Sequence, residues 1–81
     1  MPKVFQKDGY KFFFYSNEGN PREPYHVHIK KAENNAKYWI TPNINLAENY
    51  GFSSKELNWI EEQVIENIKL IEDTWNDFFS E

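Results

Sequence analysis

Two histidines and a lysine recur at every second position in the stretch PYHVHIKK, residues 24–31. His26 and His28 are the only histidines in the chain, and Lys30 follows them at the same spacing. Side chains two residues apart on a β-strand point to the same face. The spacing therefore places two imidazoles and an ammonium group together, as a metal site, as an acid–base site or as one polar face of a strand.

A metal site is the first interpretation. Two histidines on one strand face can share an ion. A stable zinc site, however, needs four protein ligands, or three protein ligands and a bound water. The predicted neighbouring strands offer no well-placed carboxylate, and the chain has no cysteine. We therefore predict no metal ion and no other cofactor.

RNA binding, with or without metal-independent RNA cleavage, is the second interpretation. Histidine can act as general base on a 2′-hydroxyl and as general acid on the leaving oxygen near neutral pH. Lysine ammonium groups can stabilise the charge on the phosphate. The catalytic candidates are His26, His28, Lys30 and Lys11. Side chains that could stack on bases or contact phosphates are the RNA-binding candidates Arg22, Phe13, Tyr15, Lys37 and Trp39.

An ordinary solvated strand face is the third interpretation. Polar side chains are common on the solvent side of a strand, and a histidine there is often only hydrated or hydrogen-bonded. The aromatic residues on such a face would then be covered by a partner or by a second copy of the chain. The residues alone leave these interpretations open.

Several short strands must position these residues. Alternation in the segment that holds the histidines places Val27 and Ile29 on the core side. The segment YKFFFYS is apolar on both faces, and we place Phe12 and Phe14 inward. Asp8-Gly9 predicts a hairpin turn, since glycine readily adopts a positive φ. Strands are predicted at about residues 3–7, 10–16, 25–31 and 36–41, with a short helical turn at about 45–50.

A long helix is predicted at about residues 54–79. Apolar residues recur there at steps of three and four and form one stripe along the helix. Ser53 and Glu56 have the spacing of a capping box at its start.

The length of this helix raises a second question about function. It would measure about 40 Å at 1.5 Å per residue, whereas strands of six or seven residues span only about 20 Å. Its last turns should either bend back or overhang the sheet and meet a partner protein, because exposed apolar patches usually mark such sites. The partner-binding candidates are Ile71, Trp75, Phe78 and Phe79.

Length and composition limit the protein class. The 81 residues form a single domain, 1–81, and 19% of them are aromatic, which favours a packed core over disorder. Residues 1–52 carry seven Lys/Arg and five Asp/Glu, a balance of +2, whereas residues 53–81 carry two and eight, a balance of -6. We expect a cytoplasmic protein, since no signal peptide, membrane span or cysteine is evident.

The segments DGYKFFFYSNEG, HVH, AKYWI and LAENYGFSSKELNWIEEQVIENIKLIEDTWNDFF together resemble a small bacterial family, the domain-of-unknown-function family four-one-six-zero. The resemblance runs from Phe5 to Phe79. The family usually has Pro-Pro before its His-x-His, whereas here Pro24 is followed by Tyr25. Members are similar to proteins encoded beside another small protein, in gene pairs suspected to be toxin–antitoxin modules. The resemblance therefore implies a cytoplasmic bacterial protein with a small protein partner, and it supplies no catalytic residues.

Together these observations predict an α+β fold, with a three- to four-stranded antiparallel sheet packed on one long C-terminal helix. The function we expect is a toxin-like, RNA-targeting component of a two-protein toxin–antitoxin-type module, whose partner is an antitoxin-like protein. The alternative is a non-catalytic protein-binding or scaffold module that acts as a homo-oligomer.

Overall fold

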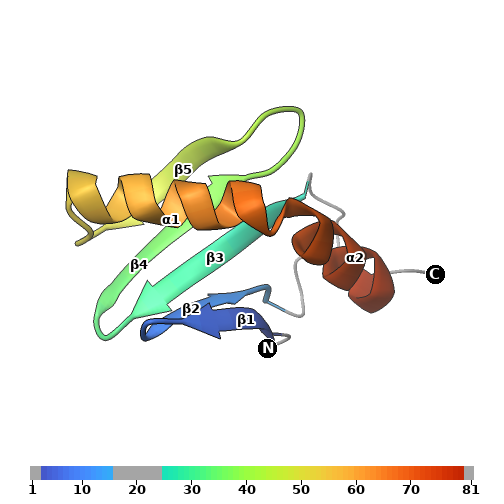
Figure 1. The fold of residues 1–81 in the computed structure, drawn as a ribbon, viewed down its shortest axis with the longest axis horizontal. Helices are drawn as coiled ribbons and strands as arrows, with labels where there is room; N and C mark the ends of the chain where they lie inside the picture. The colour runs from blue at the N-terminus through green and yellow to red at the C-terminus, as the bar shows by residue number, and fades with distance from the viewer. Residues whose placement is uncertain (1–2, 16–24, 80–81) are drawn as a thin grey trace.

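The computed structural model describes residues 3–15 and 25–79, and its fold is α+β, as expected (Figure 1). Five antiparallel strands lie in the sheet in chain order, and two helices follow them. The prediction of three or four strands and one helix was therefore short by one or two strands and by one helix. The elements are β1 (Lys3–Lys7), β2 (Tyr10–Phe13), β3 (His26–Lys31), β4 (Asn34–Trp39), β5 (Asn45–Tyr50), α1 (Ser54–Glu66) and α2 (Ile68–Phe79).

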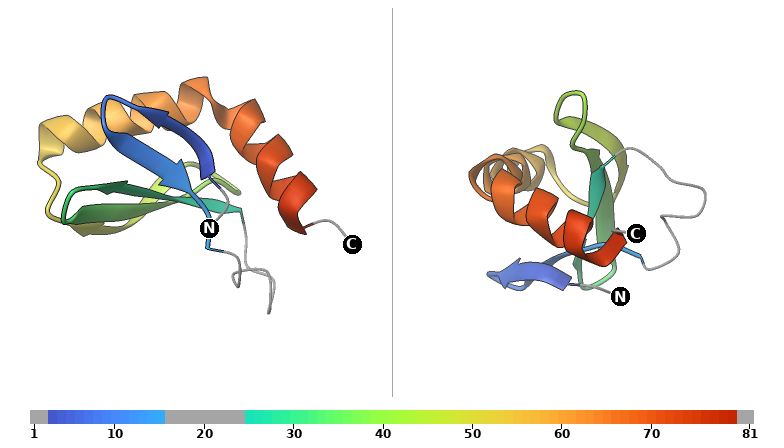
Figure 2. Two further views of the ribbon diagram at one scale, coloured as in Figure 1. Left: turned by 90° about the horizontal axis from the view of Figure 1, so that it is seen from below. Right: turned by 90° about the vertical axis from the view of Figure 1, so that its right-hand side faces the viewer.

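The sheet curls around the helices instead of lying flat. In Figure 2, α1 runs along one face of β3 and β4, and the β1–β2 hairpin turns underneath the helices. A hydrogen bond from Lys7 Nζ to Gln63 Oε1, 3.2 Å long, joins β1 to α1 across this curve. One face of the sheet is thus occupied by helices, and the described helices leave the opposite face open except at the start of β3, where Trp75 of α2 contacts His26.

The core lies between the sheet and the helices. The predicted inward residues of β2 and β3 are buried, with Phe12, Val27 and Ile29 each 0% exposed, and so is Phe14 directly after β2. The hydroxyl of Tyr38 donates to the carbonyl oxygen of Leu57 at 3.2 Å and so ties β4 to α1. The remaining core residues come from both layers and include Tyr10, Ala36, Ile40, Phe52, Ile60, Val64, Ile71 and Trp75.

β5 occupies residues 45–50, where the sequence predicted a helical turn, so that prediction was wrong. The strand pairs with β4 along its length, with a bulge beside Tyr38. The following Gly51 has φ 103°, and this conformation ends a strand as readily as it ends a helix. Pairing with β4 has therefore outweighed the local helical preference, as is common for strand segments.

The start of α1 agrees with its predicted capping box. The backbone N–H of Glu56 donates to Ser53 Oγ at 3.1 Å, and the backbone N–H of Ser53 donates to Glu56 Oε1 at 3.0 Å. These bonds satisfy two groups that the first helical turn would leave unpaired.

The predicted single helix is two helices, which separate at Asn67. The carbonyl oxygen of Gln63 accepts two hydrogen bonds from Asn67, one from its backbone N–H at 3.0 Å and one from its side-chain amide at 2.8 Å. The chain axis bends there, and α2 turns toward the end of the sheet (Figure 2). Ile71 and Trp75 are each only 1% exposed as a result. Neither described helix is long and apolar enough to cross a membrane.

Candidate functional site

The sheet face turned away from the helices carries most of the candidate residues, and we call it the outer face. Neighbouring strands align these residues in rows, because cross-strand partners in an antiparallel sheet point to the same side. The predicted register of β2 is confirmed, since Phe12 lies in the core and Lys11 is exposed. The rows are Lys11–Lys30–Asn35, Phe13–His28–Lys37 and His26–Trp39.

An aromatic cluster of Phe13, Tyr15 and His28 occupies the middle of the outer face. The ring of His28 lies 4.6 Å from Tyr15 and 5.6 Å from Phe13, measured between centroids. Phe13 is only 4% exposed, whereas Tyr15 is 42% exposed. Tyr15 can therefore offer a surface for base stacking, and the expected stacking role does not fit Phe13, which lies beneath its neighbours.

The two histidines are adjacent, as their spacing predicted, but only one reaches the surface. Their ring centroids are 5.2 Å apart. His28 is half-buried, whereas His26 is 0% exposed and contacts Trp39 at 5.5 Å and Trp75 at 5.1 Å. A direct contact between His26 and RNA does not fit this burial. The burial of His26 was not predicted, because the sequence gives no sign that α2 turns across the start of β3.

Trp39 and Lys37 form a second feature of the outer face. Both are half-buried, and the Lys37 ammonium nitrogen lies 4.3 Å from the centre of the Trp39 ring. This cation–π contact holds a positive charge beside a flat ring. The pair can contact a phosphate and a base at neighbouring positions.

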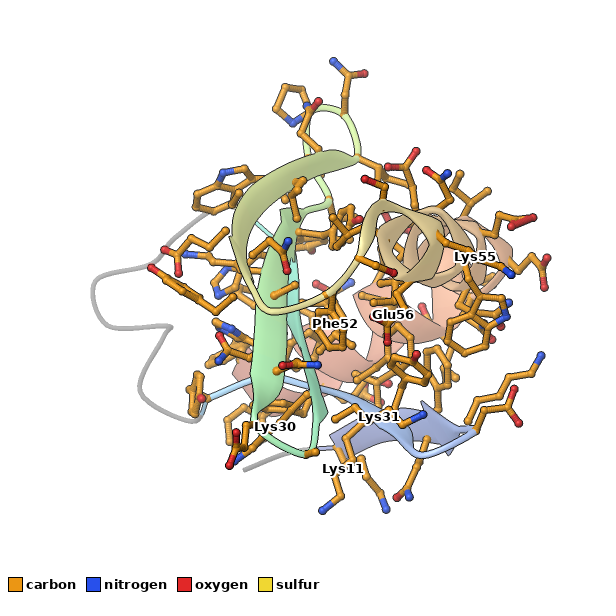
Figure 3. The ribbon with its side chains drawn as sticks, turned by 90° about the vertical axis from the view of Figure 1, so that its left-hand side faces the viewer. Lys11, Lys30, Lys31, Phe52, Lys55 and Glu56 are labelled. Carbon is orange, nitrogen blue, oxygen red and sulfur yellow. The ribbon has the colours of Figure 1, made fainter. Side chains whose placement is uncertain are left out.

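A pocket of about 230 Å³ opens at the end of the sheet where two hairpin turns meet, and we call it the lysine pocket. Figure 3 shows this end, with Lys11 and Lys30 on adjacent strands and Lys31 on the side nearer Glu56. None of the described lining residues carries a carboxylate. They are Gly9, Lys11, Phe13, Lys30, Lys31 and Ala32.

Lys31 is the member of this pocket that sequence reasoning missed. Lys31 was assigned to neither face from the sequence, and in the structure β3 ends at Lys31 and its side chain is exposed. Its ammonium nitrogen lies 4.4 Å from the centre of the Tyr10 ring. The doubled lysine before a turn was the available signal, because a cation at the end of a strand need not be buried.

Tyr10 connects this end of the sheet to the start of α1. Its hydroxyl donates to Glu56 Oε2 at 2.7 Å. Hydrogen bonds from the Ser53 backbone and from Tyr10 lower the pKa of the Glu56 carboxyl, and the charge of Lys31 acts in the same direction. The same bond to Glu56, together with burial, raises the pKa of Tyr10. Glu56 is therefore held as an anion on the helix side of Lys31.

Charge is divided between the two layers of the fold. Along the described strands the charged residues are Lys3, Lys7, Lys11, Lys30, Lys31 and Lys37, with Glu48 as the single carboxylate. The described helices carry Lys55 and Lys69 against Glu56, Glu61, Glu62, Glu66, Glu72, Asp73 and Asp77. A polyanion would therefore approach the sheet and be repelled by the helices.

The described residues contain no group of three His, Asp or Glu side chains that could hold a metal ion. Arg22, an RNA-binding candidate, lies outside the described residues.

The partner-binding candidates divide into buried and exposed residues. Ile71 and Trp75 lie in the core, so the expected overhang is absent at these positions. Phe79 is half-buried against the core, and Phe78 is 45% exposed. Only Phe78 keeps a substantial free surface.

Comparison with models of protein families identifies the family of the chain. Residues 9–76 match the model of the family described as Domain of unknown function (DUF4160), so the chain belongs to that family. No curated protein and no solved structure gave a match.

Proposed function

We propose that this member of the DUF4160 family is the RNA-targeting component of a two-protein, toxin–antitoxin-type module that acts in the cytoplasm. The observation that carries the proposal is the make-up of the outer face. Lysines from three neighbouring strands stand there beside accessible aromatic rings. The resemblance to proteins encoded in gene pairs supports the two-protein arrangement.

Single-stranded RNA is the form of nucleic acid that suits this face. Proteins bind single strands by combining cations for the backbone with aromatic rings on which bases stack. Lys11, Lys30 and Lys37 supply the cations, and Tyr15 and Trp39 supply the rings. The acidic helices on the other side of the fold repel RNA, so they favour its approach to the outer face.

Binding fits the outer face better than cleavage does. Metal-independent cleavage needs a general base and a general acid that both touch the RNA. His28 has exposed surface for one of these roles, but His26 has none. We therefore assign RNA binding to the face and give His26 the role of packing against His28.

Affinity for a short fluorescent single-stranded RNA tests the proposal directly. In the Lys30→Gln/Lys37→Gln variant, two phosphate contacts are lost, so we expect about tenfold weaker binding and a salt slope reduced by about 1.4, since each contact with a single strand contributes about 0.7. The matched control is Lys55→Gln/Lys69→Gln, which removes the same charge from the helices and should bind like wild type. Equal losses in both variants would show that only net charge matters, and would reject the face.

Growth of a bacterium that expresses the chain alone tests the biological part of the proposal. We expect growth arrest with wild type and with the helix control, and relief by the Lys30→Gln/Lys37→Gln variant at equal protein level. The protein encoded beside it should relieve the arrest when co-expressed. Arrest that is insensitive to the outer-face substitutions would contradict the assignment of the face.

A homo-oligomeric scaffold is the second candidate, and one observation favours it. β5 is the last strand in the sheet order, and its Leu46 and Tyr50 are 43% and 61% exposed. An edge strand with exposed apolar side chains can pair with another chain. Sedimentation of wild type and Leu46→Lys over a range of concentrations would show a mass difference if β5 mediates self-association, and identical monomers if it does not.

A further inference from the structure

The lysine pocket has a composition that calls for an anion. Its lining includes Lys11, Lys30 and Lys31, and its described residues contribute no carboxylate. Lys11 and Lys30 are direct cross-strand partners. Like charges placed directly opposite each other oppose strand pairing. Neither Lys11 nor Lys30 forms an ion pair with another described residue. The fold therefore tolerates the repulsion between these two lysines without a visible counterion.

Local backbone geometry keeps the third lysine close to the pocket. Gly9 has φ 85° and no side chain, and a Cβ placed there would lie 3.4 Å from Lys31 Cε and 3.9 Å from Lys31 Nζ. Lys31 can therefore cross the β1–β2 turn and rest over the Tyr10 ring, 4.4 Å from its centre. From this position a rotation of its flexible stem can carry the ammonium group toward the pocket.

Phe13 gives the pocket an apolar wall. It is 4% exposed, belongs to the aromatic cluster and lines the pocket together with the three lysines. A wall of low polarity reduces the screening of the ammonium charges by water, which strengthens their attraction for an anion. The pocket volume of about 230 Å³ leaves room for a phosphate group and part of a sugar.

We propose that the lysine pocket binds a phosphomonoester group, supplied by the 5′ end of an RNA strand or by a free nucleotide. A phosphomonoester carries close to two negative charges at pH 7, since its second pKa is about 6. An internal phosphodiester carries one. Three lysines around one pocket match the more highly charged group, and the RNA source rests on the proposed RNA-binding function.

The position of the pocket gives a path for the rest of the strand. Lys30 and His28 are two residues apart on β3 and share the outer face, which separates them by about 6.6 Å. A nucleotide whose 5′-phosphate sits in the pocket would therefore extend toward the aromatic cluster. The next base would meet Tyr15, which is 42% exposed.

Two RNAs of identical sequence, one with a 5′-phosphate and one with a 5′-hydroxyl, test the inference by fluorescence anisotropy at fixed salt. We expect the phosphorylated RNA to bind about tenfold more tightly, with a steeper salt dependence. Lys11→Gln/Lys31→Gln should abolish this ratio, whereas Lys55→Gln/Lys69→Gln should keep it. Circular dichroism of each variant confirms that a lost ratio is not lost folding.

The outcomes separate this inference from the proposed function. Equal binding of the two RNAs would overturn the phosphate pocket and leave RNA binding by the outer face intact. Binding of neither RNA would remove the proposed function, and titration with adenosine monophosphate, followed by amide NMR shifts, then decides on the pocket. Shifts at Gly9 and Ala32 that vanish in Lys11→Gln/Lys31→Gln would support a nucleotide source, and their absence would overturn the inference.

Discussion

The indole ring of Trp75 lies 5.1 Å from the imidazole ring of His26, so the last turns of α2 meet the first residue of β3. Trp75 also contacts the rings of Tyr25 at 5.3 Å and Phe14 at 5.0 Å. A side chain that the helix pattern offered to a partner protein is therefore a core residue. Its burial is also what removes His26 from solvent.

Replacement of Trp75 by alanine should strongly destabilise the fold. The side chain is 1% exposed and its loss leaves a large cavity, so we expect the free energy of unfolding to fall by about 3–5 kcal/mol. Urea denaturation measures this change. Phe78→Ala is the control on the same helix, and because Phe78 is 45% exposed it should cost less than about 1 kcal/mol. Similar losses in both variants would show that α2 does not pack as described.

Chemical modification should distinguish the two histidines. Diethylpyrocarbonate reacts with accessible imidazole nitrogens, and His26 is 0% exposed while His28 is half-buried. We expect peptide mass spectrometry to find the adduct on His28 in the folded protein, and on both histidines in urea. Modification of His26 before His28 under native conditions would contradict the enclosure of His26 by the two tryptophans.

Glu56 should make the stability of the fold depend on pH in the acidic range. Hydrogen bonds lower the pKa of its carboxyl below 4.5, so its contribution is present above that value and is lost as pH falls through the folded-state pKa. Glu56→Gln keeps the shape of the capping box but loses the charge. We expect it to lower the melting temperature at pH 7 and to narrow the difference between pH 7 and pH 3.

The control for Glu56 is Glu62→Gln, which removes an exposed carboxylate elsewhere on α1. Its melting temperature should follow the wild-type dependence on pH. A response equal to that of Glu56→Gln would assign the effect to the net charge of the helix instead of to the bonds with Tyr10 and Ser53.

Tyr38 should govern the alkaline limit of the fold. Burial raises its pKa from 10.0 to about 12, with a smaller contribution from the charge of Glu61. Stability from the neutral phenol is therefore complete below pH 10 and is lost as pH rises through 12. Absorbance at alkaline pH should show that one late tyrosine ionisation disappears in Tyr38→Phe. An unchanged titration curve would contradict the burial of this hydroxyl.

The strand faces could be predicted from sequence because their signals are local. Alternation places successive side chains on opposite sides, and this was sufficient to assign Val27 and Ile29 to the core and His28 to the outer face. The start of α1 was also predictable, since the capping box of Ser53 and Glu56 lies within four residues.

The direction of α2 could not be predicted, because it depends on contacts between distant segments. The apolar stripe continues across Asn67 without a proline or glycine, so its periodicity does not reveal the bend. The burial of Trp75 and His26 then follows from packing that no local pattern encodes. The lysine pocket was missed for a related reason, since two hairpin turns far apart in sequence form it.

Gly51 should be among the least replaceable residues of the chain. It has φ 103°, and a Cβ there would lie 2.1 Å from Asn34 Oδ1 and 2.7 Å from Asn34 Cγ. Alanine would meet both an unfavourable backbone conformation and a steric overlap. We expect Gly51→Ala to lower the free energy of unfolding by about 2–3 kcal/mol, measured by urea denaturation.

Two further variants separate these causes. Gly9→Ala has a comparable φ of 85°, but its nearest contact is Lys31 Cε at 3.4 Å, so it should cost about 1 kcal/mol and less than Gly51→Ala. Adding Asn34→Ala to Gly51→Ala removes the overlap and should recover part of the loss. If the double variant is no more stable than Gly51→Ala, backbone conformation alone explains the requirement for glycine where β5 leads into α1.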